Sequence, residues 1–446
     1  MGCGGLPLVR SITTSTDRRT GSAMRMISFS DQRCREDMAP PMSQNAEDGL
    51  RRTLSLWQVV LYGLGVTIGA GIYVLVGVAA GRSGVFAPLA FLVAAALLSF
   101  TALSFAELGT RLPVAASEAA YVDAGFNRKW LTLATGLFVV TTSAVSAATV
   151  SVGAAGYVSV FWPAPQPILI LVVVLGMGVI ASLTTAQSVT LAGIMTTIEI
   201  GGLLAIVAAG FWNADQLRTG LQNSPMHLQD VPWAGLVSTS LIAVFAFIGF
   251  EHVVNIAEEI RDPRRTLPKA LFITLALTAL LYASVVFIAV SAIPPQELAV
   301  ANAPLARVYE RLTGHPLGMM SAIAVIATLN GIIVHMIMIS RVLYGMARTG
   351  VLAAGLGHVH PRTRTPLRAT ALAIVVILTL AIAFPLEKLA HMTAQGTLVI
   401  FFLVNTALAR IRHREQVRPP HIFHAPAFAP YAGMAATLIL LVASAW

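Results

Sequence analysis

Long apolar runs recur along the chain from about residue 54 to its end, separated by short polar connectors. Each run has about 20 residues, which at 1.5 Å per residue is enough to cross about 30 Å of hydrocarbon. The runs do not alternate apolar and polar residues, as the strands of a membrane β-barrel would. The pattern therefore predicts an all-α membrane protein with about eleven transmembrane helices.

The connectors contain helix breakers, such as Trp162-Pro163-Ala164-Pro165 and Pro294-Pro295. They place the spans at residues 56–80, 86–110, 130–161, 166–184, 190–212, 234–260, 268–293, 317–349, 367–385, 389–410 and 428–446. The predicted organisation is a disordered cytoplasmic tail at 1–50, a ten-helix core at 51–412, and a loop with an extra eleventh helix at 413–446.

The composition excludes a soluble globular protein. Of 446 residues, 56% are hydrophobic and only 11% are charged, whereas a soluble domain has about 25% charged residues. The tail is rich in Ser, Thr and Arg and lacks the apolar stretch of a secretory signal. Both cysteines, Cys3 and Cys34, lie in this tail, so no disulfide framework is predicted.

The net charge is +9, and the placement of Lys and Arg along the chain predicts its orientation. If the N-terminus lies in the cytoplasm, the inner segments after the tail carry 16 Lys and Arg and the outer segments carry 5. The positive-inside rule therefore places the N-terminus in the cytoplasm and, with eleven spans, the C-terminus outside. Nucleic acid is not an expected partner. The expected location is the plasma membrane, which is the inner membrane in a bacterium.

Two predicted spans carry glycine at their centres. The first centres near Ile68, beside Gly69 and Gly71, and the sixth near Phe247, beside Gly249. Glycine inside a helix costs about 1 kcal/mol relative to alanine. Unwound backbone in a bilayer survives only beside a cavity, because its unpaired peptide groups are costly in lipid. We therefore expect both helices to be broken near the middle of the membrane.

Such breaks suit a zwitterion. The free N–H groups and positive dipole end of a half-helix attract an α-carboxylate, and freed carbonyls accept hydrogen bonds from an α-ammonium. Close helix packing is the alternative, because Gly65 and Gly69 have small-xxx-small spacing. A second break in the corresponding place favours a binding site between two inverted five-helix repeats.

Three segments resemble the amino acid–polyamine–organocation permeases. The segment 63–73, Gly-Leu-Gly-Val-Thr-Ile-Gly-Ala-Gly-Ile-Tyr, is similar to their first helix. The segment 245–270, with Phe-Ile-Gly-Phe-Glu and Asp-Pro-Arg-Arg, is similar to their sixth helix and the following loop. The segment 329–348 resembles the eighth helix of the cationic amino acid transporter and basic amino acid–polyamine antiporter branches.

The resemblance implies a core of two inverted repeats that works by alternating access and binds an amino acid at the broken helices. It implies that the substrate carboxylate meets the first break, that the ammonium meets carbonyls of the sixth helix, and that Phe245 forms an aromatic lid. With Asn330 of the neighbouring eighth helix, the implied substrate-binding residues are Thr67, Ile68, Gly69, Ala70, Gly71, Phe245, Ala246, Ile248 and Gly249.

The chain departs from the family pattern in three places. Most members have twelve spans, whereas eleven are predicted here. After the second span the family usually has Pro-x-x-Gly-Gly, whereas Pro113 is followed here by Ser117 and Glu118. Glu199 lies where some proton-coupled members have a lysine, which leaves the coupling ion open.

Ionisable residues inside the spans need an explanation, because a charge at the bilayer centre costs at least about 2.5–3.5 kcal/mol. Glu199 either binds a proton as a coupling group, which we favour, or stays neutral and bonded to a neighbouring helix. Glu251 either titrates as the site opens or caps the N–H groups after the break. Asn330 either lines the cavity or bonds to another helix. Glu107 and Arg111 have the spacing of an i,i+4 pair.

These features predict a secondary active transporter of amino acids that works by proton-coupled symport or by exchange. The alternatives are a polyamine or organic cation transporter, a non-transporting amino acid sensor, and an ion channel. No nucleotide-binding or hydrolase motif is present, so no enzyme, cofactor or metal site is expected, and His335 is expected to be a hydrogen-bonded buried histidine. The small apolar pocket residues favour a neutral side chain, yet the resembling branch includes cationic substrates, so the substrate stays open.

Overall fold

The computed structural model describes residues 54–112, 117–182, 185–223, 231–348, 352–360, 365–415 and 421–443. Within these ranges the chain is helical, and the β structure consists of one isolated bridge between Leu54 and Ile260. Here the N–H of Leu54 donates to the carbonyl of Glu259 at 3.0 Å, and the N–H of Arg261 donates to the carbonyl of Leu54 at 3.2 Å. The all-α prediction is confirmed. The expected tail at 1–50 lies outside the described residues.

Every predicted span coincides with one helix or with two half-helices. The first five spans are α2 (Leu56–Thr67) with α3 (Ala70–Ser83), α4 (Ala87–Arg111), α6 (Lys129–Val158), α7 (Gln166–Ala181) and α8 (Thr185–Trp212). The next five are α10 (Trp233–Phe247) with the 3-10 helix η3 (Phe250–Glu259), α11 (Pro263–Ala292), α14 (Gly318–Arg348), α15 (Leu367–Ala383) and α16 (Leu386–Arg414), and α17 (Ala429–Ala443) follows. The connectors contain η1 (Gly84–Phe86), α5 (Ser117–Phe126), α9 (Ala214–Asn223), α12 (Pro295–Ala299), α13 (Pro304–Thr313) and η4 (Ala354–Gly357).

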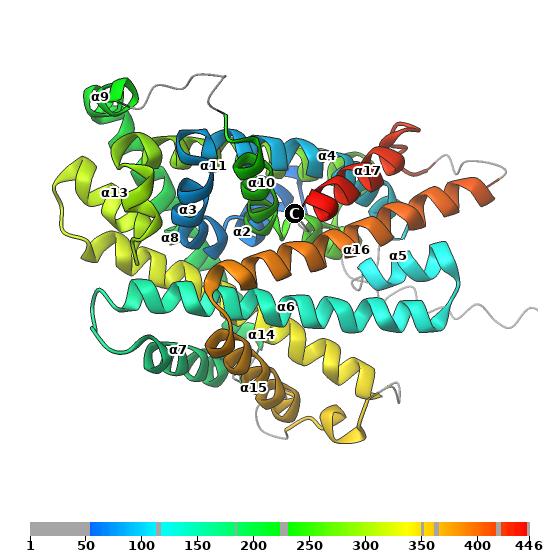
Figure 1. Cartoon of the computed structure of the whole chain (residues 1–446). Helices are drawn as coiled ribbons and strands as arrows, with labels where there is room; N and C mark the ends of the chain where they lie inside the picture. The colour runs from blue at the N-terminus through cyan, green and yellow to red at the C-terminus, as the bar shows by residue number, and fades with distance from the viewer. Residues whose placement is uncertain are drawn as a thin grey trace, which may run out of the picture. The chain divides into compact units, whose positions relative to one another are not determined.

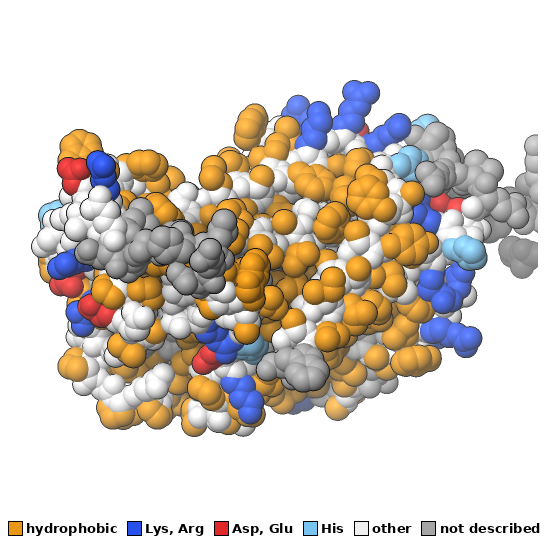
Figure 2. All heavy atoms as spheres, turned by 45° about the horizontal axis from the view of Figure 1, so that its top comes forward, with side chains coloured by type: hydrophobic (Ala, Val, Ile, Leu, Met, Phe, Trp, Pro, Cys, Tyr) orange, Lys and Arg blue, Asp and Glu red, His pale blue; other side chains and the backbone are white. Residues whose placement is uncertain are grey.

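The helices have the length and surface of membrane spans. In the described residues, seven stretches are long and apolar enough to cross a membrane by length and composition. One of them, Ala70–Arg111, contains parts of two predicted spans, because η1 joins α3 directly to α4. The remaining predicted segments, α2, α7, α15 and α17, are shorter apolar helices. Figure 2 shows hydrophobic side chains over most of one face, with Lys and Arg mostly along its edges, as expected for a surface that faces lipid.

Corresponding helices of the two halves pack against each other. The half-helix α3 contacts α10, α4 contacts α11, and α6 contacts α14. Figure 1 shows the long helix α6 running across the bundle beside α14 and α16. This pairing agrees with two inverted repeats that pack against each other.

A buried carboxylate joins α4 to α16. The side chain of Glu107 is fully buried, accepts from Arg111 Nη2 at 2.6 Å, and forms an ion pair with Arg412. It also accepts from the backbone N–H of Ala425 at 2.8 Å, and Arg111 forms a second ion pair with Glu415. The predicted Glu107–Arg111 pair is confirmed, and it belongs to a larger network that fixes the chain leading into α17.

Candidate functional site

The first membrane span is interrupted after Thr67. The helix α2 ends there, Ile68 is extended with φ −77° and ψ 104°, and α3 begins at Ala70. Among the described residues, no side chain forms a capping hydrogen bond at the start of α3. Tyr282 of α11 donates its hydroxyl to the carbonyl of Thr67 at 3.0 Å, so one backbone group released by the break is already bonded. The N–H of Gly69 also bonds to this hydroxyl, whereas no side chain caps the N–H groups in the first turn of α3.

The sixth span is interrupted at Gly249. The helix α10 ends at Phe247, and Gly249 has φ +121°, a conformation that side chains with a Cβ rarely adopt. The chain then continues as a ten-residue 3-10 helix, which rises about 2.0 Å per residue and is longer and narrower than an α-helix of equal length. The carboxylate of Glu251 accepts from the N–H of Gly249 at 2.9 Å. Glu251 therefore bonds to the break residue itself, one position before the N–H groups of η3 that it was expected to cap.

The two breaks are in direct contact. A Cβ added to Gly249 would lie 2.5 Å from the carbonyl oxygen of Val66, and one added to Gly71 would lie 2.8 Å from the Cα of Ala246. A Cβ added to Gly69, in contrast, would have nothing within 4 Å except its own neighbours along the chain. The backbones of the two spans therefore touch on both sides of the breaks, while Gly69 at the start of α3 faces open space.

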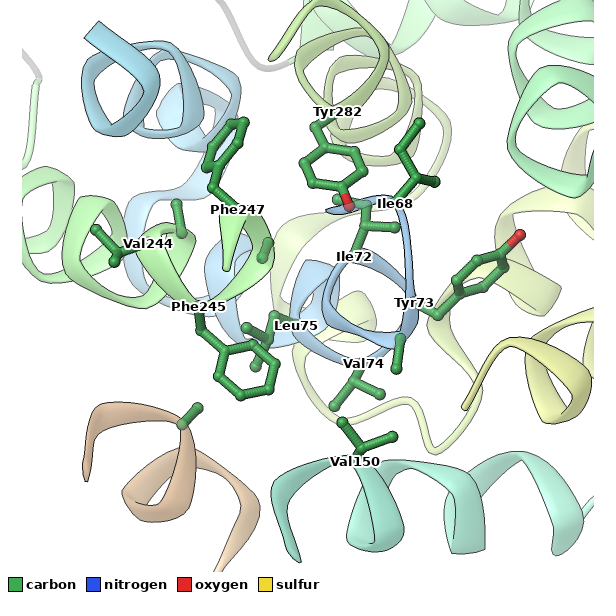
Figure 3. Close-up of a cluster of buried hydrophobic side chains, with 14 of the residues drawn as sticks. Ile68, Ile72, Tyr73, Val74, Leu75, Val150, Val244, Phe245, Phe247 and Tyr282 are labelled. Atoms are coloured by element: carbon green, nitrogen blue, oxygen red, sulfur yellow. The ribbon is translucent and has the colours of Figure 1, made fainter. Parts of the chain in front are cut away.

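Aromatic side chains hold the sixth-span break in place. Phe247, before the break, packs on Tyr282 and Phe91 with ring centroids 5.4 and 6.4 Å apart. Phe250, after the break, packs on Phe105 and Phe401 of other helices at 6.3 and 5.8 Å. Figure 3 shows Phe247 and Tyr282 on one side of α3, with Phe245 near Leu75 and Val74 facing Val150 of α6. These contacts fix the position of Gly249.

A second group of predicted residues joins α2, α8 and α14. Asn330 donates its side-chain amide to Glu199 Oε1 and to Thr196 Oγ1, both at 3.3 Å. The Thr196 hydroxyl lies 3.4 Å from the carbonyl of Gly65, and Tyr73 donates to the carbonyl of Glu199 at 2.7 Å. Glu199 is fully buried, and its Oε2 has no hydrogen-bond partner among the described residues. The bond to another helix expected for Asn330 is present.

A cavity lies beside the sixth-span break and extends toward α5. The empty space of the cavity, including open solvent at its mouth, is about 420 Å³. Of the predicted site residues, Ile248 and Glu251 line it. The other described residues around it are Glu118, Val139, Thr142, Ser143, Ser146, His252, His335, Met338, Thr393, Thr397, Ile400 and Phe401.

The predicted site residues thus occupy three neighbouring places. Thr67, Ile68, Ala70, Phe245 and Ala246 are buried where the two spans cross. Glu199 and Asn330 form the group on α8 and α14, whereas Ile248 and Glu251 face the cavity. His335 has the expected hydrogen bond, because its Nε2 lies 2.6 Å from the Ser146 hydroxyl, and it also lines the cavity.

Two residues of the site were missed from the sequence. Tyr282 binds the carbonyl of Thr67, but a tyrosine inside an apolar span gives no sign of its partner. Glu118 lines the cavity, and the sequence marked it only as a departure from the family motif after the second span. The sequence therefore marked Glu118 as unusual but did not indicate that it lines a cavity.

Replacing Tyr282 with phenylalanine is expected to lower the free energy of unfolding by about 1–3 kcal/mol, because the Thr67 carbonyl would lose its buried donor. Thermal unfolding of the purified protein in detergent measures this change. Tyr431→Phe is the control, since Tyr431 is 62% exposed on α17. Equal midpoints for Tyr282→Phe and Tyr431→Phe would show that the Tyr282 bond contributes little.

Comparison with known proteins agrees with this geometry. A family model described as amino acid permease matches residues 54–446. The chain is 27% identical to the branched-chain amino acid permease BcaP of Bacillus subtilis, over 89% of each chain, and 30% identical to an uncharacterized transporter of Mycobacterium tuberculosis, over 81% of this chain and 80% of that one. It is 27% identical to human cationic amino acid transporter 4, over 86% of this chain and 63% of that protein. These relatives are named as transporters and permeases rather than enzymes, and the chain belongs to the amino acid permease family of multi-pass membrane transport proteins.

Proposed function

We propose that this protein is a secondary active transporter that carries amino acids across the plasma membrane by alternating access, with its N-terminus in the cytoplasm. The observation that carries the proposal is the contact between two spans that are both interrupted at the middle of the bundle. Uncapped N–H groups at the start of α3 and the open space at Gly69 supply a place for the α-carboxylate. The carbonyls at the end of α10 supply acceptors for the α-ammonium.

The two ends of the bundle support alternating access. At the predicted outer end, Arg82 of α3 forms an ion pair with Glu387 of α16, lies 2.8 Å from His391 Nε2, and bonds to Ser238 of α10. These bonds join both outer half-helices to α16. At the other end the cavity approaches the sixth-span break from the side of α5. These contacts support a cycle in which the outer end is closed while the inner helices part to release the substrate.

Transport itself is the direct test. Purified protein in proteoliposomes is expected to take up radiolabelled amino acids and to exchange them for internal amino acid. Acceleration by an inward proton gradient would indicate symport, whereas dependence on internal substrate would indicate exchange. Saturable binding without any flux would instead identify a sensor, and ionic currents without saturation would identify a channel. Both outcomes would contradict the proposal.

Glu199 is proposed as the proton-coupling residue. Its carboxylate is fully buried, bonds to Asn330, and is connected through Thr196 to the carbonyl of Gly65, in the last turn of α2 before the break. A proton on this carboxylate would turn an acceptor into a donor and change the bonds that hold α2 against α8. Gain or loss of one proton would thus favour one position of the first span over the other.

Replacing Glu199 with glutamine is expected to abolish acceleration of uptake by a proton gradient while exchange continues, because glutamine keeps the shape and the acceptor for Asn330 but cannot titrate. Uptake and counterflow measured on the same vesicles separate the two activities. Glu297→Gln, on an exposed position of α12, should leave both unchanged. Gradient-driven uptake that persists in the Glu199 variant would assign coupling to another group.

A further inference from the structure

The guanidinium of Arg82 joins three helices at the predicted outer end of the bundle. Its Nε donates to Glu387 Oε1 of α16 at 2.6 Å, and its Nη2 forms the ion pair with the same carboxylate. Its Nη1 donates to the Ser238 hydroxyl of α10 and lies 2.8 Å from Nε2 of His391, one turn further along α16 than Glu387. One side chain thus attaches α3 and α10, the outer half-helices of both interrupted spans, to α16.

The contact between Arg82 and His391 fixes the protonation state of the imidazole. A guanidinium has only N–H donors, whereas a ring nitrogen of histidine accepts only while it carries no proton. At 2.8 Å from Arg82 Nη1, His391 Nε2 is therefore the acceptor, and the ring is neutral with its proton on Nδ1. A proton added to Nε2 would set two N–H donors against each other and place an imidazolium beside a guanidinium, which repel.

The charged groups that act on His391 are Arg82 and Glu387, which are bonded to each other. The ammonium of Lys388 lies over the Phe384 ring, 4.8 Å from its centroid. The described helices α10 and α17 carry no charged residue. The charged residues of the other long helices that contact α16 lie toward the predicted inner end: Glu107 and Arg111 of α4, Glu118 and Asp123 of α5, Lys129 of α6, and Arg368 of α15. A charge on His391 would therefore act on the Arg82–Glu387 pair and on no other ion pair in the described part of the chain.

We propose that His391 is a positioning residue for the outer gate, by which we mean the bonds that Arg82 forms with α10 and α16. While neutral, His391 holds the guanidinium in place; a proton taken up from the outer solution releases it, and α3 and α10 can then move away from α16. This role rests on the transport function proposed above and names what regulates its outer opening. Solvent reaches the gate, because the side chains of Arg82 and Glu387 are 28% and 48% exposed. The closed gate excludes the proton, so by linkage the proton favours the open gate, and acid outside promotes opening.

The accessibility of a cysteine beneath the gate tests this role. Leu75 is fully buried, lies about two turns before Arg82 on the same face of α3, and is close to Phe245 of α10 (Figure 3). With Cys3 and Cys34 replaced by serine, Leu75→Cys is labelled from outside with a membrane-impermeant thiol reagent. Its rate is divided by that of Val300→Cys, an outer position that is 81% exposed, which corrects for the pH dependence of the thiol itself. This ratio is expected to rise about five- to tenfold between about pH 8 and about pH 5.

Variants of His391 separate its charge from its packing. In the Leu75→Cys protein, His391→Gln keeps an acceptor for Arg82 at every pH but cannot titrate, so the ratio should stay low and independent of pH. His391→Lys carries a permanent cation and should give a high ratio at both pH values. His315→Gln, at an exposed histidine on the same side, is the matched control and should follow the wild type. A wild-type ratio that does not change with pH, or a pH dependence that survives in His391→Gln, would overturn the proposal.

A second variant keeps the test decisive if His391→Gln does not reach the membrane. Arg82→Gln removes the guanidinium that a charged His391 would release, so the ratio should be high and should no longer follow pH. A pH dependence equal to that of the wild type would refute the role of His391. Because labelling needs no substrate, the two proposals also fail separately. Flux of amino acids with pH-independent labelling would refute the histidine gate alone, whereas pH-dependent labelling without flux for any amino acid would support the gate and refute transport.

Discussion

Replacing Gly69 with valine is expected to abolish most transport while the protein stays folded in the membrane. Gly69 has φ −152°, which any residue adopts, and a Cβ there meets nothing within 4 Å. The valine side chain would therefore fill the open space in front of the N-terminus of α3 rather than disturb the packing. A steric penalty of about 1–3 kcal/mol against the substrate corresponds to roughly 5- to 150-fold weaker binding.

Two matched variants distinguish this blockage from loss of fold. Gly176→Val, on α7, also enters open space but lies far along the chain from both breaks, so its transport should equal that of the wild type. Gly249→Ala should instead destabilise the protein, because its φ of +121° and the Val66 carbonyl at 2.5 Å exclude a Cβ. Transport assays and unfolding midpoints of the three variants give the comparison. Full transport activity of Gly69→Val would contradict the proposal that the substrate carboxylate binds at the start of α3.

Replacing Glu107 with glutamine is expected to give the largest loss of stability, about 3–5 kcal/mol, because it leaves two guanidinium groups without their shared counterion. The side chain of Arg111 is 7% exposed and that of Arg412 is 14% exposed, so neither can be fully hydrated in place. Thermal unfolding in detergent and the amount of protein in membranes both measure the effect. The chain around Ala425 should become more accessible to protease, since Glu107 also holds its N–H.

The control for this prediction is an exposed carboxylate. Glu297→Gln should change the free energy of unfolding by less than about 0.5 kcal/mol, as is usual for surface substitutions. An unfolding midpoint of Glu107→Gln equal to that of Glu297→Gln would mean that Glu415 alone suffices to neutralise the arginines around Arg111.

The sequence predicted the helices and both breaks because each has a strong local cause. Runs of about 20 apolar residues have few alternatives to a membrane helix. Glycine at the centre of two such runs, in corresponding places, pointed to Gly69 and Gly249, and the structure interrupts the helices at both positions. The i,i+4 spacing of Glu107 and Arg111 was likewise enough to predict their ion pair, since both residues lie on one helix.

The sequence did not reveal which distant groups meet. Arg412 and Ala425 join Glu107 from more than 300 positions away, and no local pattern encodes that approach. The 3-10 geometry of η3 was also not predicted, because no local pattern in its residues distinguishes a 3-10 helix from an α-helix. Glu118 belongs to the cavity only because α5 packs against α6 and α16, a placement that depends on the whole bundle.

The bridge between Leu54 and Ile260 joins the N-terminal end of the first interrupted span to the C-terminal end of the sixth. While its two backbone hydrogen bonds persist, neither end can move away alone, so the inner opening that we propose has to displace both together. A displacement of one half-helix on proton or substrate binding would then move the other directly through these backbone hydrogen bonds. The gating step of this permease would in that case be concerted, with a single barrier rather than two.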